Sequence, residues 1–227
     1  MGKIITIDGP AGSGKSTVSR LLAKRLGYVY LDTGAMYRAV ALKAKRDSVD
    51  LKDRGRISGL CRNLDLYFKT VDGTSRIFLG SEDISTAIRS PEMDMLSSAV
   101  SAIQEVREAM TTLQRKMARQ GGIVAEGRDM GTVVFPAAEC KFFVDADPGV
   151  RAGRRYLERV DRGEAVSRGE VEKELRKRDD QDTTRALAPL VPAEDAVIMD
   201  TTHLTVEEVV ERMIRIVEKG DKKTPKE

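Results

Sequence analysis

The chain has 227 residues, which is enough for one substantial hydrophobic core and a smaller lobe. Its 39 basic and 36 acidic residues leave a net charge of only +3, so nothing in the composition favours a nucleic-acid or membrane partner. The presence of a single histidine, His203, argues against a histidine-based triad and a multi-histidine metal site, and neither Cys61 nor Cys140 has the spacing of a metal ligand.

The same residues bear on localisation and assembly. We expect two inert thiols in a reducing cytosol, and His203 as a surface or capping residue. No run approaches the roughly 18 apolar residues of a membrane span, and the N-terminal apolar run is too short for a signal peptide. We therefore expect a cytoplasmic protein, and a monomer because no long exposed apolar stripe requires a partner.

A glycine-rich loop lies near the N-terminus. The stretch TIDGPAGSGKST matches G-x-x-x-x-G-K-[S/T], in which glycines let backbone N–H groups turn toward a phosphate. A buried strand at residues 4–8 precedes it, and a helix starting at Ser16 follows, as the motif requires. We predict that Lys15 reaches the outer phosphates of a nucleoside triphosphate and that Ser16 ligates Mg²⁺. An ordinary glycine-rich turn is the alternative.

Five short apolar runs predict a parallel sheet. They span residues 4–8, 28–31, 122–126, 141–145 and 196–200. Helical patterns lie between or after them, which favours an α/β fold with helices on both faces. The last helix should begin at a capping box formed by Thr205 and Glu208. Its apolar face should consist of Val206, Val209, Val210, Met213 and Val217.

The segment between the second and third runs is too long for a single crossover helix. Alternating apolar residues flank an Asp72-Gly73 turn in LDLYFKTVDGTSRIFLG, which predicts an antiparallel hairpin within residues 64–79. A long helical pattern follows. Its apolar positions are Met93, Leu96, Val100, Ile103, Val106, Met110, Leu113 and Met117. Residues 33–121 are therefore predicted to form an inserted lobe.

Two charged stretches follow predicted strands. In LDTGAMYR, Asp32 and Arg38 flank the start of a helix, where ligands of open α/β sheets bind; simple helix capping by Asp32 or Thr33 is the alternative. In EGRDMGT, Arg128 could take an anionic oxygen and Asp129 could accept from an amino group. A surface ion pair in a turn is the alternative there.

Two further stretches are rich in arginine. A helix over DPGVRAGRRYLERVDR would place five arginines in one stripe, which are Arg151, Arg154, Arg155, Arg159 and Arg162. A solvated helix face is the ordinary explanation of such a run. In RDDQDTTR, helical spacing puts Arg178, Asp182 and Arg185 on one side, where an exposed salt-bridged helix end is the alternative. Together the arginines of three segments favour phosphoryl transfer between two anions, under a mobile lid that excludes water.

The stretches GPAGSGKST, LDTGAMYR, EGRDMGTVVFP and RDDQDTTRALAPLVPAEDAV, in this order, resemble the bacterial cytidylate (CMP) kinases of the nucleoside monophosphate kinase family. The resemblance covers about residues 3–217. It implies a core ATP-binding domain (residues 1–32, 122–148 and 188–220), a monophosphate-binding insert (33–121), a lid (149–187) and a disordered tail (221–227). The implied fold is a P-loop kinase with a five-stranded parallel sheet, a small antiparallel sheet in the insert and a helical lid.

The resemblance also implies residue roles. ATP would contact the loop and two lid arginines, namely Gly9, Pro10, Ala11, Gly12, Ser13, Gly14, Lys15, Ser16, Thr17, Arg154 and Arg155. CMP would contact Thr33, Tyr37, Arg38, Ser98, Arg107, Arg128, Asp129, Arg178, Asp182 and Arg185. Lys15, Arg128 and Arg185 would be catalytic. Mg²⁺ would bind Ser16, with Asp32 reaching it through water.

The implied reaction is transfer of the γ-phosphoryl group of ATP to CMP, and to dCMP, in pyrimidine nucleotide metabolism. One alternative is a related kinase that acts on another small acceptor such as UMP, AMP or shikimate. A second alternative is a nucleotide-dependent switch or binding module. The guanine-binding N-K-x-D motif of a GTPase is absent, because the only asparagine is Asn63.

Overall fold

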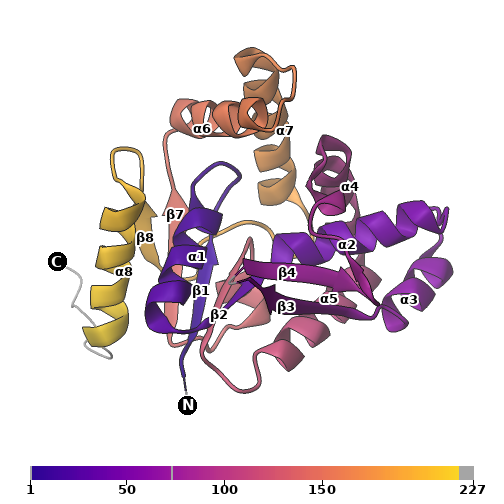
Figure 1. The fold of residues 1–227 in the computed structure, drawn as a ribbon, viewed down its shortest axis with the longest axis horizontal. Coiled ribbons are helices and arrows are strands. Elements are labelled where there is room, and N and C mark those ends of the chain that lie inside the picture. Colours follow the sequence, from indigo (N-terminus) through magenta and orange to yellow (C-terminus); the bar gives the residue numbers. More distant parts are fainter. Residues whose placement is uncertain (1, 73, 220–227) are drawn as a thin grey trace.

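The structure, a computed structural model, describes residues 2–72 and 74–219 (Figure 1). Within these residues, five parallel strands form the central sheet in the order β2-β6-β1-β7-β8. The strands are β1 (Ile4–Asp8), β2 (Val29–Asp32), β6 (Ile123–Gly127), β7 (Cys140–Asp145) and β8 (Val197–Asp200). The predicted sheet is confirmed. Strands β1 and β6 are almost wholly buried, as expected for the middle of a parallel sheet covered on both faces.

The strand register brings the stretches that follow β1, β2 and β6 to one edge of the sheet. Asp8 at the end of β1 pairs with Gly127 of β6, and Asp32 at the end of β2 pairs with Glu126. The glycine-rich loop follows β1, and the EGRDMGT stretch follows β6. Because the carboxyl ends of parallel strands share an edge, these loops are neighbours.

Two helices cover one face of the sheet. Helix α1 (Lys15–Leu26) and helix α8 (Val206–Lys219) lie side by side in Figure 1 and share one apolar cluster with β1 and β7. The predicted capping box of α8 is confirmed, since the Thr205 N–H donates to Glu208 and the Glu208 N–H donates to Thr205 Oγ1. His203, just before it, is exposed as expected.

The other face carries helix α2 (Thr33–Arg46) and the inserted segment. This segment contains helix α3 (Arg54–Arg62), strands β3 (Leu66–Val71), β4 (Thr74–Leu79) and β5 (Glu82–Asp83), a 3₁₀ turn (Ala87–Arg89), helix α4 (Pro91–Ser101) and helix α5 (Gln104–Met117). The predicted hairpin is confirmed, with Leu66 opposite Leu79, and β5 adds a third strand to its described part. Gly73 of the predicted turn and the predicted tail at 221–227 lie outside the described residues.

The long helical pattern of the insert is not one helix. Helix α4 ends at Ser101, with Ala102 as its C-cap, and Ile103 is extended, with φ −89° and ψ 124°, before α5 begins. The spacing of apolar residues continues across the break because the side chains of Val100, Ile103 and Val106 all pack in the same hydrophobic core. The break frees the Ser101 carbonyl, which accepts from Arg107 at 3.2 Å.

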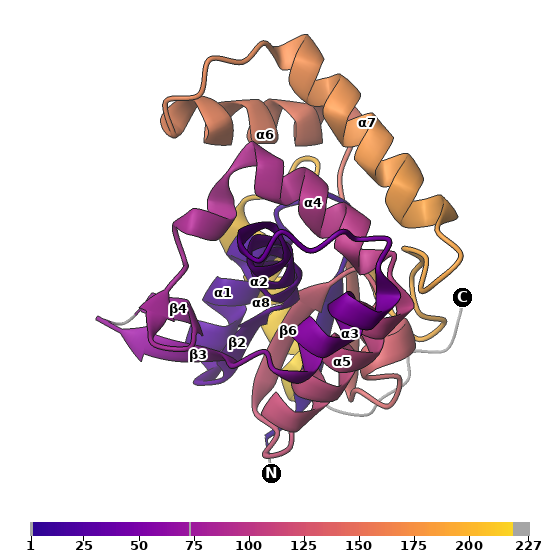
Figure 2. The ribbon, with the colours of Figure 1, turned by 90° about the vertical axis from the view of Figure 1, so that its right-hand side faces the viewer.

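Two helices form an arch over the sheet edge. Helix α6 (Pro148–Asp161) and helix α7 (Arg168–Thr184) pack together through Ala152, Val171 and Leu175, which also meet Ala11 of the glycine-rich loop. Figure 2 shows α6 and α7 above α4, and α4 and α7 are in contact. None of the helices in the described ranges has the length and apolar character needed to cross a bilayer.

Candidate active site

The glycine-rich loop after β1 is shaped by residues without side chains. Gly12 and Gly14 have φ of +75° and +88°, and a Cβ at Gly12 would lie 2.8 Å from the carbonyl oxygen of Arg151. A Cβ at Gly9 would lie 2.0 Å from the carbonyl oxygen of Val144. Gly14 is also the N-cap of α1, so the positive end of this helix opens into the pocket described below.

Lys15 begins α1 and is buried. Its Nζ donates to the carbonyl oxygen of Pro10 at 2.8 Å, so the side chain folds back along the loop. Burial, reinforced by the positive charge of Arg128, lowers the pKa of Lys15 to about 7. A bound anion would reverse this shift, because it would favour the charged form.

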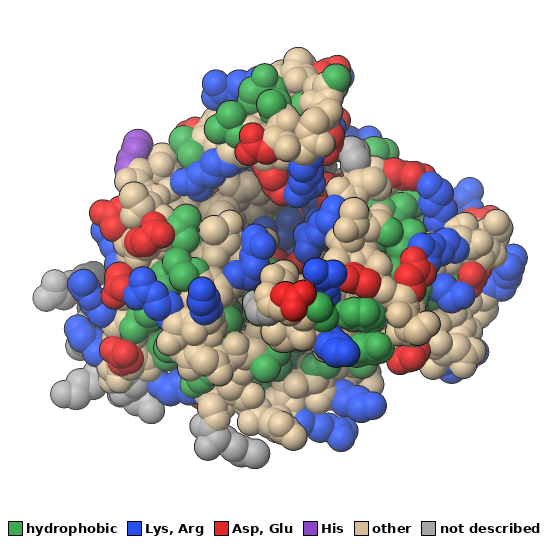
Figure 3. Space-filling view, viewed as in Figure 1, with side chains coloured by type: hydrophobic (Ala, Val, Ile, Leu, Met, Phe, Trp, Pro, Cys, Tyr) green, Lys and Arg blue, Asp and Glu red, His purple; other side chains and the backbone are tan. Residues whose placement is uncertain are grey.

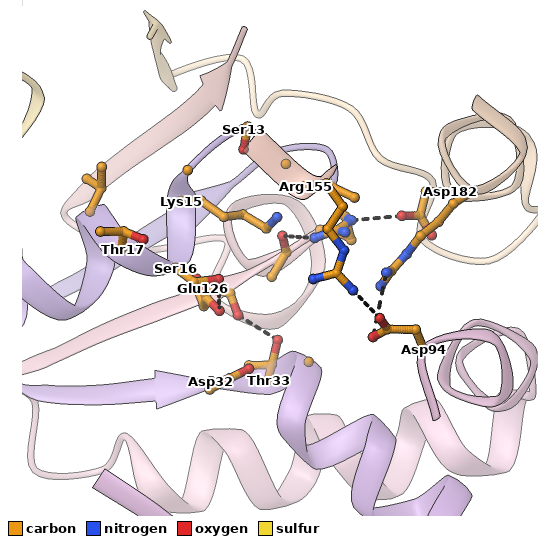
Figure 4. A pocket seen from close by; sticks show the side chains of 18 of the residues that line it. Ser13, Lys15, Ser16, Thr17, Asp32, Thr33, Asp94, Glu126, Arg155 and Asp182 are labelled. Carbon is orange, nitrogen blue, oxygen red and sulfur yellow. Dashed lines mark hydrogen bonds and ion pairs between the residues drawn. The ribbon is translucent and has the colours of Figure 1, made fainter. Parts of the chain in front are cut away.

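A hydroxyl and a carboxylate meet at the first turn of α1, as Figure 4 shows. Ser16 Oγ donates to Glu126 Oε1 at 2.8 Å, and Glu126 Oε2 is buried without a hydrogen bond from any described residue. Burial and the nearby Asp32 charge raise the pKa of Glu126. Hydroxyl and carboxylate oxygens are ligands that Mg²⁺ accepts, and it usually takes only one or two from the protein. These residues therefore fit the predicted Mg²⁺, with Glu126 as an oxygen donor that the sequence analysis did not assign.

Asp32 fulfils the capping role that was left open as an alternative. Its Oδ1 accepts from the Ala35 N–H at 2.8 Å, and its Oδ2 accepts from Arg89 at 2.8 Å. Although burial opposes ionisation, Arg89 and Arg38 hold the pKa of Asp32 below its ordinary value. Asp32 is thus a helix cap and an ionised carboxylate at the edge of the pocket.

The carboxyl end of β6 is linked to helix α7 by an ion pair. Arg128 Nε donates to Asp182 Oδ2 at 2.8 Å, and Arg185 lies 3.9 Å from Asp182 Oδ1. Arg178 is one turn earlier on α7. Burial and the Arg128 charge lower the pKa of Arg178 to about 10, and its Nε has no hydrogen-bond partner among the described residues. These guanidinium groups are enclosed rather than solvated, so the alternative of an exposed salt-bridged helix end is wrong.

Asp129 belongs to a second cluster. It is buried, accepts from Arg107, and has Arg185 3.6 Å from its other oxygen. The alternative of an Arg128–Asp129 pair in a surface turn is therefore wrong. The Arg107 guanidinium lies over the Tyr37 ring at 5.8 Å from its centroid, and the Tyr37 hydroxyl is buried without a partner in the described part of the chain.

Two hydroxyl residues predicted to bind CMP also make cross-contacts. Thr33 Oγ1 donates to the Glu126 carbonyl at 2.6 Å and so ties α2 to β6. Ser98 Oγ donates to Gln181 Oε1 at 3.3 Å and so links α4 to α7. Both side chains line the pocket, and each hydroxyl already donates its proton in one of these hydrogen bonds before a ligand binds.

The arginine stripe of α6 divides into two groups. Arg151 donates to the Ala11 carbonyl at 3.1 Å and pairs with Asp179, which fastens α6 and α7 to the loop. Arg159 pairs with Glu164 and with Glu174 of α7. Arg154 and Arg155 face the pocket instead, where Arg154 contacts Thr201 and Arg155 reaches Asp94. Arg162 also lines the pocket, but it is exposed and pairs with Glu158. The ordinary explanation, a solvated face, fails for the other four residues.

One pocket of about 580 Å³ gathers most of the predicted residues. Figure 3 shows it as a hollow below the lid helices, with Lys and Arg side chains around it. The predicted residues that line it are Ala11, Gly12, Ser13, Gly14, Lys15, Ser16, Thr17, Asp32, Thr33, Tyr37, Arg38, Ser98, Arg107, Arg128, Asp129, Arg154, Arg155, Arg178, Asp182 and Arg185. Gly9 and Pro10 do not line it; Gly9 serves the loop's packing and Pro10 holds Lys15.

Besides Glu126, three acidic or basic residues of the site were missed by sequence reasoning. Asp94 and Arg89 line the pocket from the insert. Asp8 is buried below it and accepts from the N–H groups of Met130 and Gly131, which fixes the turn after Asp129. The signal for Asp94 was an acidic residue between two methionines of the α4 pattern, whereas Arg89 and Asp8 carried no distinctive signal.

Comparison with known proteins gives consistent results. A family model described as cytidylate kinase matches residues 5–219. A cytidylate kinase from a Geobacter species is 50% identical over 225 residues, covering 97% of both chains. One from Pelotomaculum thermopropionicum is 51% identical over 217 residues, covering 95% of this chain and 96% of the relative. A solved structure of an uncharacterised protein from Eubacterium ventriosum, 13% identical, has a TM-score of 0.52 over 95% of this chain and 98% of its own, which is a likeness of fold alone.

Proposed function

The chain belongs to the cytidylate kinase family, and we propose that its pocket holds ATP and CMP end to end for transfer of the γ-phosphoryl group. The reaction converts ATP and CMP into ADP and CDP. The observation that carries this assignment to the site is the convergence of Lys15 with arginines from α2, the β6 loop and α7 on one pocket.

The loop and the start of α1 are proposed to bind the ATP phosphates. Lys15 would leave the Pro10 carbonyl for a phosphate oxygen, and α1 would direct its positive end at the same group. Arg154 and Arg155 would approach the triphosphate from the lid. Arg154 already faces the loop side of the pocket, since it lies 3.4 Å from the Ser13 carbonyl oxygen, whereas Arg155 is paired with Asp94 and would have to leave it.

The opposite half is proposed to bind CMP. Arg38, Arg128 and Arg185 would hold its phosphate, and Arg178 and Asp182 would contact the sugar. Ser98, Arg107 and Asp129 would read the cytosine edge. Burial raises the pKa of Asp129 above its ordinary value, and the Arg107 and Arg185 charges oppose this shift by favouring the ionised form. The carboxylate oxygens keep acceptor capacity, which suits Asp129 to accept from an amino group. Thr33 and Tyr37 would complete this wall.

The chemistry needs positioning and charge neutralisation more than covalent help. A dianionic acceptor phosphate requires no general base, and the arginines would stabilise the negative charge that spreads over the transferred group. When bound at Ser16 and the neighbouring carboxylates, Mg²⁺ would neutralise charge on the ATP phosphates. Lid helices α6 and α7 would exclude water, and so prevent wasteful ATP hydrolysis.

We also propose the division into core, insert and lid given above, a cytoplasmic location, a monomeric state and activity on dCMP. The lid assignment is supported by the small apolar contact of α6 and α7 with the rest of the chain, at Ala11.

A coupled ADP-release assay with ATP, Mg²⁺ and a panel of CMP, dCMP, UMP and AMP tests the function. We expect kcat/KM to be highest for CMP and dCMP. A value for AMP at or above that for CMP would contradict the cytosine assignment. A slow ADP release that no monophosphate stimulates would instead indicate a switch or binding module.

A further inference from the structure

Asp94 is an acidic residue at the centre of an arginine cluster. It lies on α4, and its side chain is 16% exposed. Arg38 of α2 donates both Nε and a terminal nitrogen to its Oδ1, each at 2.8 Å. Arg155 of α6 donates to its Oδ2, and Figure 4 shows these two side chains pointing toward each other. Arg178 of α7 lies 3.9 Å from Oδ1.

This arrangement joins three separate parts of the chain. Arg38 belongs to the acceptor wall, and Arg155 and Arg178 belong to the lid helices. Without a counter-ion, three guanidinium groups at these distances would repel one another. Although burial opposes its ionisation, Arg38, Arg178 and Arg155 hold the pKa of Asp94 below its ordinary value. Asp94 is therefore a fixed negative charge in a site built for anions.

We propose that Asp94 is a positioning residue that stands in for a substrate phosphate, holding the acceptor and lid arginines together until nucleotides replace it. The proposal rests on the function proposed above, because it takes these arginines as phosphate ligands. A phosphate oxygen needs the same Arg38 donors that Oδ1 occupies. Asp94 thus competes with the acceptor phosphate, and it keeps the lid close to α4 in the free enzyme.

Asp94→Asn tests the competition with a matched control. The amide keeps the shape and the acceptor oxygen but removes the charge. Sulfate, as an inhibitor competitive with CMP, should then bind roughly tenfold more tightly, and KM for CMP should fall while kcat does not rise. Glu92→Gln removes another α4 acid that pairs with an α2 cation, Lys45, at 2.5 Å but lies outside the pocket. It should leave sulfate inhibition unchanged.

If Asp94 had a purely structural role, the opposite change in sulfate inhibition would be expected. Arginines that lose their support would bind sulfate more weakly, so weaker or unchanged sulfate inhibition in Asp94→Asn would overturn the proposal. Asp94→Glu keeps the charge and should restore wild-type sulfate inhibition. Thermal unfolding of all three variants would identify any that fails to fold. If Asp94→Asn fails, the sulfate inhibition of Asp94→Glu still separates charge from packing, because this variant changes the shape of the side chain and keeps its charge. Glu92→Gln is the reference in that comparison.

Hydrogen exchange of the free enzyme tests the link to the lid. Peptides from α6 should exchange faster in Asp94→Asn than in the wild type, because Arg155 loses its tie to α4, and Glu92→Gln should match the wild type. Equal protection in all variants would contradict the link. This measurement uses no substrate, whereas failure of the proposed function would appear as absent CMP-dependent ADP formation in the wild type.

Discussion

The two halves of the pocket are built by different means. The half around Lys15 comes from one continuous stretch, the loop after β1 and the first turn of α1, and its shape is set by backbone conformation. The half around Arg38 draws on α2, α4, α5, the turn after β6 and α7, and side-chain ion pairs hold it together. The first half is therefore largely preformed, while the second depends on charges that a ligand can displace.

This difference predicts where substitutions act. A change in the loop half should affect ATP and the chemical step with little effect on the other half, because its geometry is local. A change in the acceptor half should alter CMP binding together with stability, because each ion pair there also joins two elements. The following predictions test this contrast.

Lys15→Ala should have the largest effect. Lys15 is the only lysine among the residues that line the described pocket. Removing its amine should lower kcat about a thousandfold, the upper end of the range for loss of one group that stabilises transition-state charge. The free energy of unfolding should change little, since the cost of burying the Lys15 amine is removed together with its Pro10 contact. Steady-state ADP release and urea unfolding measure both. Lys24→Ala, on the exposed face of α1, is the control and should leave both unchanged.

Asp129→Ala should act on the opposite half. It leaves Arg107 and Arg185 without their shared counter-ion, so KM for CMP should rise about a hundredfold, and stability should fall by about 3 kcal/mol because a buried charge pair is broken. Calorimetry should show ATP affinity within about twofold of the wild type, since no loop contact is lost. An equal loss of ATP and CMP affinity would contradict the separation of the halves.

The same contrast explains what the sequence could predict. The five parallel strands, the hairpin and the helix after the loop follow from local apolar period and a local motif, and they are found where expected. The break at Ile103 was not predictable from period, because the apolar spacing continues through it. A tertiary contact between Arg107 and the freed Ser101 carbonyl accompanies it.

Residue types in the site were predictable, but their pairing was not. Arg128 and Asp129 are adjacent in the chain, yet they turn to different partners, Asp182 and Arg107. Asp94 pairs with residues 56 and 61 positions away in the chain. Such pairs depend on how α4 and the lid meet, which no local pattern encodes.

Gly12→Ala tests whether the loop half depends on backbone shape. At φ +75° with a Cβ 2.8 Å from the Arg151 carbonyl oxygen, alanine should distort the loop and weaken ATP binding roughly tenfold, leaving the affinity for CMP unchanged. Gly27→Ala is the matched control. Gly27 has φ +67° and open space around its Cβ position, so it should cost about 1 kcal/mol of stability without altering ATP affinity. Equal ATP affinity in both variants would show that the loop adapts.

The smallest expected effect is a proton taken up by the loop half. In the free enzyme the pKa of Lys15 is about 7, against an ordinary 10.5, so at pH 8 its amine is mostly neutral. Between pH 7 and pH 10.5 the unfolded chain binds more protons than the folded chain, and the stability of the free enzyme should therefore rise with pH across this window.

ATP should return Lys15 to its charged form. Calorimetry at pH 8 in buffers of different ionisation enthalpy should therefore detect uptake of nearly one proton on ATP binding, and almost none at pH 6. Lys15→Arg, which stays charged throughout, should abolish the uptake while retaining ATP binding; the same uptake in both proteins would assign the proton to another group.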